Sequence, residues 1–305
     1  MFLFESLPLH TILMGFAVLA GLMLANELAR ANKWIALGIF LVLPIYLTFF
    51  VWPHTAGPET SVGTWFHYAK VYSVLIITLG IMGIRYIKAW ADNQYMLAFP
   101  ALLLAINILE AVVRDFQCYN LNGFVDGVVI TGGSWNIMNG IAGILNILAI
   151  SGWAGIFISK GKKKDMIWPD QLWFWIIAYD LWNFAYVYNA LGDHAFYAGL
   201  ILLLSCTIPA FFIKKGAWLQ HRAQTLAVWV MFAMTFPAFI DTSKYAVKAS
   251  QNTTVLFLVS AIALLANIAL IIYHVYKIVK TKRNPFKQEI YSDLPSYQSI
   301  VEENK

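Results

Sequence analysis

The stretch AFYAGLILLLSCTIPAFFI, residues 195–213, contains nineteen residues and no formal charge. A helix of that length rises about 30 Å, which matches the hydrocarbon core of a bilayer. The rest of the chain has the same character, since 60% of its 305 residues are hydrophobic and 12% are charged. A soluble domain carries about twice that charged fraction. The sequence therefore predicts an all-α integral membrane protein built as a helical bundle.

Apolar runs long enough to cross a bilayer occur nine times along the chain, and the third, sixth and eighth also carry ionisable residues. They cover residues 10–29, 34–52, 64–84, 95–113, 134–158, 168–190, 195–213, 223–247 and 253–276. We expect about nine transmembrane helices in one polytopic domain, residues 1–283. The polar segment that follows, residues 284–305, is expected to be a mobile tail.

Lysine and arginine are concentrated in alternate connections between these runs. One set of connections holds sixteen of them and the opposite set holds four. Cytoplasmic loops carry the excess of basic residues, so the N-terminus is expected outside and the C-terminus in the cytoplasm. The richer set consists of Arg30, Lys33, Arg85, Lys88, Lys160, Lys162, Lys163, Lys164, Lys214, Lys215, Arg222, Lys277, Lys280, Lys282, Arg283 and Lys287.

The net charge of +5 is therefore read as a topology signal and not as affinity for nucleic acid. We expect the lipid bilayer of the cell membrane as the partner of the apolar helices. The basic stretch SKGKKKD, residues 159–165, is expected to face anionic lipid at the cytoplasmic surface.

Polar residues within the apolar runs fall mostly in the half of the membrane that the topology assigns to the outside. Ionisable groups at such depth are costly and usually face the bundle interior or a water-filled cavity. The sequence therefore predicts an outward-facing polar cavity with Asp180 at its floor, lined partly by Tyr179, Trp182, Tyr186 and Tyr188. The other candidates for it are His67, Lys70, Glu110, Arg114, Asn136, Asn139, Asn183, Asp241 and Lys244.

Several of these residues also have a purely structural interpretation. Lys70, Arg114, Lys244 and Lys248 are long enough to reach the outer surface by snorkelling. The asparagines are of the type that holds membrane helices together. Glu110 and Arg114 are four residues apart and could neutralise each other. Asp180 has no cation within one turn of its own helix, so it needs a partner from elsewhere or a proton.

Sequence motifs for metal and nucleotide chemistry are missing. The six histidines, at positions 10, 54, 67, 194, 221 and 274, form no HxxH or HExxH pair. The chain also lacks a G-x-S-x-G elbow, a P-loop and a dinucleotide-binding glycine motif. We therefore expect no metal site and no cofactor, and an unknown small solute as the ligand.

Two stretches, WPDQLWFWIIAYDLWNFAYVYN (168–189) and LLSCTIPAFFIKKGAWLQHRAQTLAVW (203–229), resemble a family of bacterial multi-spanning membrane proteins without assigned function. That resemblance implies an inner-membrane location and no particular activity. The stretch FIDTSKYAVK, residues 239–248, resembles in part the microbial rhodopsins, in which a lysine binds retinal near an acid. It departs from them, because Asp241 and Lys244 are three residues apart instead of four and rhodopsins have seven helices.

A transporter or channel-like carrier for a small solute or ion fits these features best. In this hypothesis Asp180 takes up a proton or cation, while Asp241 and Lys244 form a gate beside a helix break at Pro237. A membrane-embedded enzyme that acts on a lipid or lipid-linked group is an alternative, with Glu110 or Asp180 as its acid–base residue. A ligand-binding sensor is a third, with a retinal photoreceptor as a special case.

Overall fold

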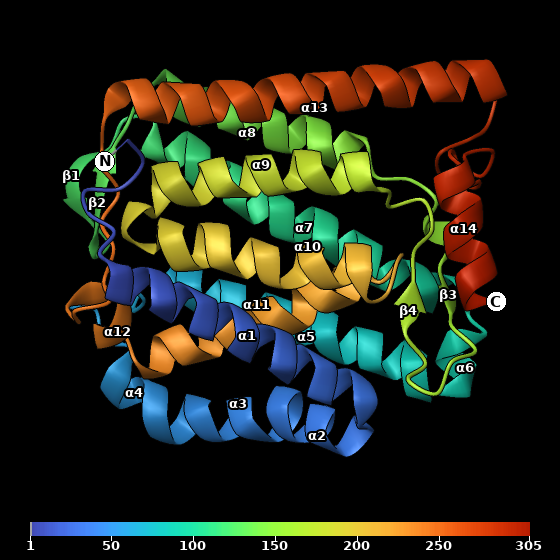
Figure 1. The fold of residues 1–305 in the computed structure, drawn as a ribbon, viewed down its shortest axis with the longest axis horizontal. Helices are drawn as coiled ribbons and strands as arrows, with labels where there is room; N and C mark the ends of the chain where they lie inside the picture. The colour runs from blue at the N-terminus through green and yellow to red at the C-terminus, as the bar shows by residue number, and fades with distance from the viewer. Residues whose placement is uncertain (1) are drawn as a thin grey trace.

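Long helices lie side by side in the computed structural model, which describes residues 2–305 (Figure 1). Short segments close the bundle at its two ends. We call one the hairpin end, where strands β1 (Asn122–Val125) and β2 (Val128–Thr131) lie beside the N-terminus. The other is the tail end, which carries helix α14 (Pro295–Asn304).

The main helices are α1 (Leu9–Ala31), α5 (Trp65–Tyr86), α7 (Gln94–Cys118), α8 (Ser134–Leu148), α9 (Trp173–Ala190), α10 (Leu202–Phe212), α11 (Trp218–Thr235) and α13 (Thr253–Thr281). Helices α2 (Lys33–Leu37), α3 (Leu43–Tyr46) and α4 (Trp52–Thr55) are joined by two π-helical turns into one continuous element. The remaining short pieces are α6 (Lys88–Ala91), α12 (Ala238–Asp241), β3 (Phe157–Ile158) and β4 (Met166–Ile167). A 3-10 turn, Gly192–His194, and a π-helical stretch, Ala195–Ile201, lead into α10.

Six of these helical elements are long and apolar enough to cross a membrane. They span Leu9–Ala31, Lys33–Thr55, Trp65–Tyr86, Gln94–Cys118, Gly192–Phe212 and Thr253–Thr281. The other three predicted runs also form helices, namely α8, α9 and α11, and they lie within the same bundle (Figure 1). Length and hydropathy thus support six of the nine expected spans, and α8 falls short because it has only 15 residues.

The predicted break at Pro237 is present. Helix α11 ends at Thr235, and Pro237 directly precedes the short helix α12. Proline lacks the backbone N–H that would continue the hydrogen-bond ladder, so the chain turns here instead of extending α11. The break leaves Asp241 at the last position of α12, at the hairpin end of the bundle.

The connection between α7 and α8 is a β-hairpin. Its turn residues Asp126 and Gly127 have φ values of 53° and 77°, the left-handed pair that a two-residue type I′ turn requires. Gly127 lies so close to the loop before α5 that a Cβ atom there would come within 2.6 Å of the Cα atom of Ser61. The hairpin is therefore seated on that loop.

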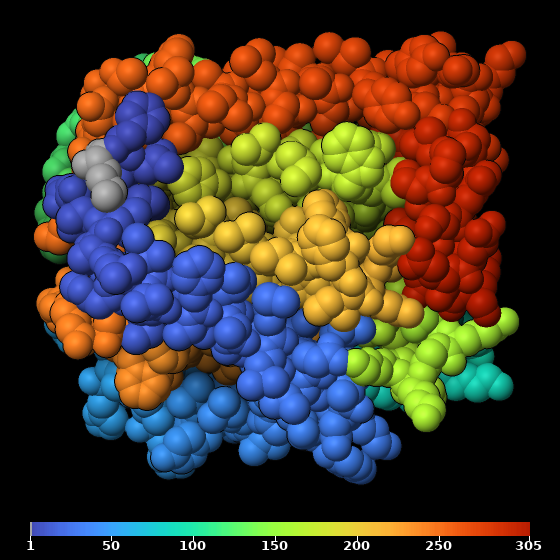
Figure 2. All heavy atoms as spheres, in the orientation of Figure 1, coloured from blue at the N-terminus to red at the C-terminus, as the bar shows by residue number. Residues whose placement is uncertain are grey.

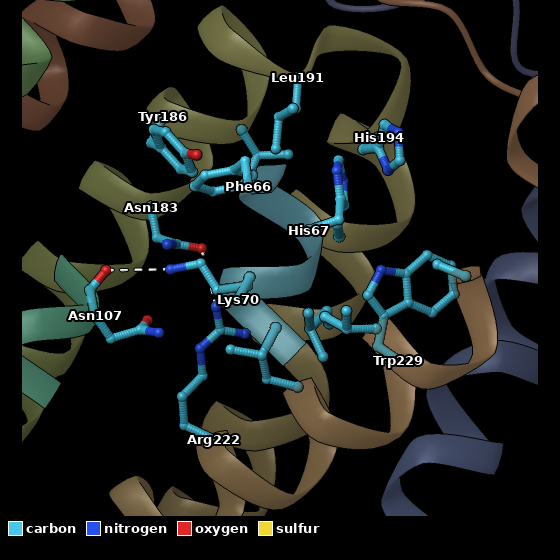
Figure 3. Close-up of a pocket in the computed structure, with 16 residues that line it drawn as sticks. Phe66, His67, Lys70, Asn107, Asn183, Tyr186, Leu191, His194, Arg222 and Trp229 are labelled. Atoms are coloured by element: carbon cyan, nitrogen blue, oxygen red, sulfur yellow. Dashed lines mark hydrogen bonds between the residues drawn. The ribbon is translucent and has the colours of Figure 1, made fainter. Parts of the chain in front are cut away.

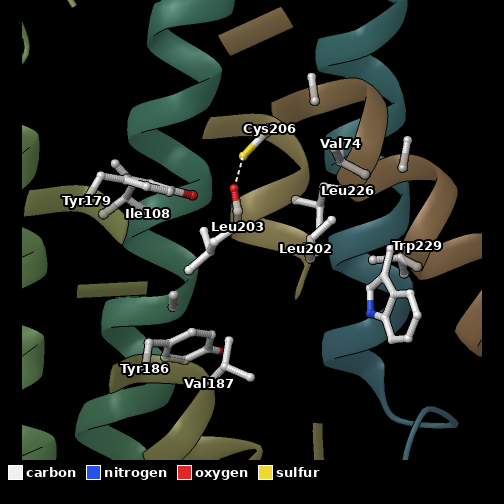
Figure 4. Close-up of a cluster of buried hydrophobic side chains, with 14 of the residues drawn as sticks. Val74, Ile108, Tyr179, Tyr186, Val187, Leu202, Leu203, Cys206, Leu226 and Trp229 are labelled. Atoms are coloured by element: carbon white, nitrogen blue, oxygen red, sulfur yellow. Dashed lines mark hydrogen bonds between the residues drawn. The ribbon is translucent and has the colours of Figure 1, made fainter. Parts of the chain in front are cut away.

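Five helices contribute to one buried apolar cluster in the middle of the bundle. Figure 4 shows side chains of α5, α7, α9, α10 and α11 that converge there, with Cys206 donating a hydrogen bond to the carbonyl oxygen of Leu203. The ring of Tyr179 packs edge-on against Trp218 at a centroid distance of 4.7 Å and stacks on Trp175 at 5.5 Å. Aromatic contacts of this kind hold α9 against the start of α11.

Residues 284–305, expected to form a mobile tail, instead pack against the bundle. Figure 2 shows this segment in red, against the ends of α9 and α10. Ile290, Tyr291 and Ile300 are buried. The Asp170 carboxylate accepts hydrogen bonds from the backbone N–H groups of Ile290 (3.0 Å) and Tyr291 (2.9 Å). Polar composition suggested mobility, but a few well-spaced apolar side chains and one buried acceptor are enough to dock the segment.

We expect Asp170→Ala to loosen this docked segment. The change leaves two backbone N–H groups without an acceptor, and each unsatisfied buried donor costs about 1–3 kcal/mol. Amide hydrogen exchange in residues 286–304 should therefore accelerate roughly tenfold or more. Asp170→Asn keeps one side-chain oxygen as an acceptor and should have a smaller effect. Equal exchange rates in Asp170→Ala and the wild type would contradict this role.

Candidate functional site

A pocket lies inside the bundle between α5, α7, α9, α11 and the segment that leads into α10. Counted with its opening, it contains about 580 Å³ of space between protein atoms. The residues that line it are Phe66, His67, Lys70, Asn107, Asn183, Tyr186, Val187, Leu191, His194, Ala198, Leu202, Arg222, Leu226, Trp229, Val230 and Ala233.

Lys70, in the second turn of α5, carries one of two cationic groups in the pocket. Its Nζ atom lies 3.1 Å from Oε2 of Glu110 on α7 and donates a hydrogen bond of 3.2 Å to the backbone oxygen of Asn107. The side chain is only 11% exposed. An ammonium group has three hydrogens, so the third remains for a ligand. Glu110, a predicted site residue, thus holds Lys70 in position.

Arg222, in the second turn of α11, carries the other cationic group. Its Nε atom donates to the hydroxyl of Tyr179 (3.3 Å) and its Nη2 atom donates to Oδ1 of Asn183 (3.2 Å). The third nitrogen, Nη1, is buried and has no acceptor among residues 2–305. A guanidinium is charged at every physiological pH, and a buried charge without a hydrogen-bonded counter-ion costs several kcal/mol.

Asp180 exerts an attractive charge on Arg222 but does not form an ion pair with it. Its Oδ2 atom instead accepts a 2.7 Å hydrogen bond from the hydroxyl of Thr207 on α10. Asp180 is not among the residues that line the pocket. The sequence predicted that Asp180 needs a partner, and its hydrogen-bond partner is the neutral hydroxyl of Thr207. The Nη1 group of Arg222 therefore keeps a free donor.

The lining of the pocket is asymmetric (Figure 3). Lys70, Arg222, Asn107 and Asn183 lie together on one side, and His67 and His194 lie together on another side. Leucine, valine and alanine side chains of α9, α10 and α11 complete the wall. The pocket thus combines a cationic end, an imidazole end and an apolar wall.

The imidazole end continues as a chain of hydrogen bonds toward the hairpin end of the bundle. The rings of His67 and His194 are 5.5 Å apart at their centroids. His194 Nε2 lies 2.9 Å from the Ser61 hydroxyl oxygen, and that hydroxyl donates to Oδ1 of Asp241 at 2.5 Å. The Ser61 backbone N–H also donates to Oδ2 of Asp241 (3.2 Å). Asp241, a predicted gate residue, is therefore linked to the pocket through Ser61.

This chain does not have the order of a catalytic triad. In a serine hydrolase the histidine lies between the serine and the acid, so that it can accept the serine proton. Here Ser61 lies between His194 and Asp241 and donates its only hydroxyl proton to the carboxylate. The arrangement is suited to passing protons along and not to activating the serine as a nucleophile.

The other predicted site residues are distributed around the pocket and not within it. Arg114 forms an ion pair with Asp126 of the hairpin at 2.8 Å and Glu110 pairs with Lys70, so the mutual pair that their spacing allows does not form. Residues four apart share a helix face, but each side chain here finds a closer partner on another element. Lys244 is exposed, with its Nζ atom 5.0 Å above the ring of Tyr245.

Asn136 and Asn139 form a separate polar cluster at the start of α8. Asn139 donates to Oδ2 of Asp115 at 2.8 Å, and the Asn136 side chain accepts from the backbone N–H of Gly133 at 3.1 Å. Trp182 is fully buried between Tyr179 and Tyr186. Of the residues predicted to line the cavity, the pocket lining includes His67, Lys70, Asn183 and Tyr186. The sequence predicted one cavity that holds all of these residues. The structure places some of them in the pocket and the others in contacts around it.

Sequence reasoning missed Arg222, which it assigned to a cytoplasmic connection. An apolar run ends where charges begin, so the eighth run covers residues 223–247, although α11 already begins at Trp218. One signal was present. Arg222, Leu226, Trp229 and Ala233 follow the spacing of one helix face, and all four line the pocket. Ser61 and His194 lie in connections and gave no comparable pattern.

The comparison with known proteins agrees with the resemblance inferred from the sequence. The model of DUF5692, a family of unknown function, matches residues 5–303. No curated protein and no solved structure matches the chain. The predicted membership in a family without assigned function is confirmed, and the chain belongs to the DUF5692 family.

Proposed function

We propose that this protein is a membrane carrier for a small organic anion that binds between Lys70 and Arg222. In this proposal all nine long helical elements cross the cell membrane, with the N-terminus outside and the C-terminus in the cytoplasm. The concentration of lysine and arginine in alternate connections supports that orientation. The hairpin end then faces the outside, and the pocket lies between it and the centre of the bundle.

The observation that carries the proposal is the free Nη1 group of Arg222. It belongs to a permanently charged side chain that is 5% exposed, lines the pocket, and forms no ion pair among residues 2–305. An anion in the pocket would accept hydrogen bonds from this group and from the Lys70 ammonium. It would also supply the negative charge that the buried guanidinium needs.

The rest of the lining narrows the class of anion. Lys70 is already paired with Glu110, so the cationic end carries about one uncompensated positive charge and favours a monoanion. The apolar wall of leucine and valine side chains favours a short hydrocarbon body over a fully hydrated ion. A short-chain monocarboxylate combines both properties. Asp180, which lies outside the pocket lining and is bonded to Thr207, remains a second candidate for proton or cation coupling through its charge on Arg222.

A thermal-shift experiment on the purified protein in detergent tests the binding step. Sodium salts of acetate, propionate and butyrate are compared with sodium chloride and sodium phosphate at equal ionic strength. We expect a saturable rise in the unfolding midpoint with a monocarboxylate, since a ligand at 100 times its Kd stabilises by about 2.7 kcal/mol. The absence of any anion-dependent shift would refute the proposal.

Uptake of the best-binding labelled carboxylate into proteoliposomes then tests transport. A carrier should give saturable uptake above that of protein-free liposomes. Saturable binding without uptake would instead support a ligand-binding sensor, which was one of the alternatives from sequence.

A further inference from the structure

We infer that Asp241, Ser61 and His194 form a proton path that loads one proton onto His194 when the anion binds. The carrier would then take up one anion and one proton together. This inference rests on the proposed function, because it specifies the coupling ion of the same pocket. It requires a continuous hydrogen-bonded path, a site that can hold the proton, and surroundings that favour that site.

The path is continuous over three side chains. Asp241 is half-buried at the hairpin end, Ser61 is buried, and His194 is buried and lines the pocket. The two joining contacts are 2.5 Å and 2.9 Å, both within hydrogen-bonding distance. Ser61 is fixed in place because its own backbone N–H bonds Asp241 and because Gly127 of the hairpin packs on its Cα atom.

The proton transfer balances along this path. A proton from solvent binds the Asp241 carboxylate, which then donates to the Ser61 oxygen. When His194 is the Nδ1–H tautomer, its Nε2 atom has a free lone pair, and Ser61 passes its own hydroxyl proton to that lone pair while it keeps the proton received from Asp241. Afterwards Asp241 is again an anion that accepts from Ser61, as observed, and His194 carries the added proton. Ser61 is unchanged, and one proton has been taken from solvent.

The charges around the two pocket histidines favour His194 over His67 as the proton acceptor. Lys70 and Arg114 are the cations that act on His67, and they oppose a further positive charge there. His194 faces His67 and Ser61, and the Asp241 carboxylate attracts a positive charge on its ring. Its sequence neighbour Asp193 interacts with Lys248, Glu5 and Asp241. Burial opposes a positive charge on both rings, and at His194 the Asp241 carboxylate, together with the anion in the pocket when it is present, offsets this cost.

The coupling follows from the electrostatics of the pocket. An anion bound to Arg222 cancels the excess positive charge of the pocket, and that charge otherwise opposes a proton on His194. A proton on His194 is therefore less costly with the anion bound than without it, so the anion and the proton should bind together. Anion binding and protonation are then reciprocally linked.

Proton uptake on anion binding is the direct test. Butyrate is added at pH 7 to the full-length protein in weakly buffered detergent solution that contains a pH-indicator dye. We expect uptake of about one proton per bound anion by the wild type. His194→Gln should lower the uptake toward zero, whereas His54→Gln, which replaces an exposed histidine outside the pocket, should leave it unchanged. Uptake that persists in His194→Gln would overturn the inference.

The wild-type protein alone gives a second test that does not depend on the folding of a variant. If one proton accompanies each anion, butyrate affinity should fall by up to tenfold per pH unit between pH 6 and pH 8. Affinity that is independent of pH, with binding intact, overturns the proton path and leaves the proposed carrier standing. No butyrate or other anion binding at any pH refutes the proposed function itself.

Discussion

Replacing Arg222 by leucine is expected to weaken anion binding by about a hundredfold or more. The change removes the fixed positive charge of the pocket and the Nη1 donor, and a hydrogen bond to a charged group contributes about 1.5–3 kcal/mol before the loss of charge is counted. Isothermal titration of the purified variant with butyrate measures the effect. Arg222→Lys keeps the charge but not the planar donor set, so its affinity should be intermediate.

The stability of the same variant distinguishes a ligand-binding arginine from a structural one. A buried guanidinium without an ion pair is costly, and leucine fits an apolar core, so the unfolding midpoint of ligand-free Arg222→Leu should match or exceed that of the wild type. Lys244→Leu is the matched control, because it removes an exposed cation that does not line the pocket. Unchanged butyrate affinity in Arg222→Leu, or its loss in Lys244→Leu alone, would contradict the assignment of the cationic end.

The second large effect is expected for Asp165→Ala, at the tail end of the bundle. Asp165 accepts from Nε and Nη2 of Arg30, each at 3.0 Å, and from Gln220 at 2.8 Å. Both charged partners are 2% exposed. Without Asp165, the buried Arg30 keeps only Glu27, which is 37% exposed, as its counter-ion. Removing one partner of a buried ion pair costs about 3–5 kcal/mol. The unfolding midpoint should fall clearly, whereas Glu303→Gln, which breaks an exposed pair with Lys215, should change it little.

The ionisation of Asp165 should also make the free energy of unfolding depend on pH. Burial alone would raise the pKa of its carboxyl, but the hydrogen bonds and charge of Arg30 outweigh burial and hold the pKa below its ordinary value. A lowered pKa means that the group stabilises the folded protein above about pH 4 and loses this effect as pH falls through its folded pKa. The wild type should therefore lose more stability than Asp165→Ala when unfolding is compared at pH 7 and at pH 3. An identical loss in both proteins would exclude this role.

The sequence by itself determined the class of the protein and most of its helices. Each of the nine apolar runs contains a helix, because a bilayer-length apolar stretch satisfies its backbone only by forming one. The break at Pro237 followed from the missing N–H of proline. These features depend on residues close together in the chain.

The tertiary structure alone decided which polar residues share a site. Glu110 has Arg114 one turn away in sequence but pairs with Lys70 of α5, because helix packing brings that ammonium within 3.1 Å. Arg222 looked like part of a basic connection and lies buried in a pocket, because α11 begins four residues before it. Ile290 and Tyr291 looked like part of a mobile tail until Asp170 supplied an acceptor. Periodicity gives a residue its face and depth on one helix, whereas its partners depend on which helices pack together.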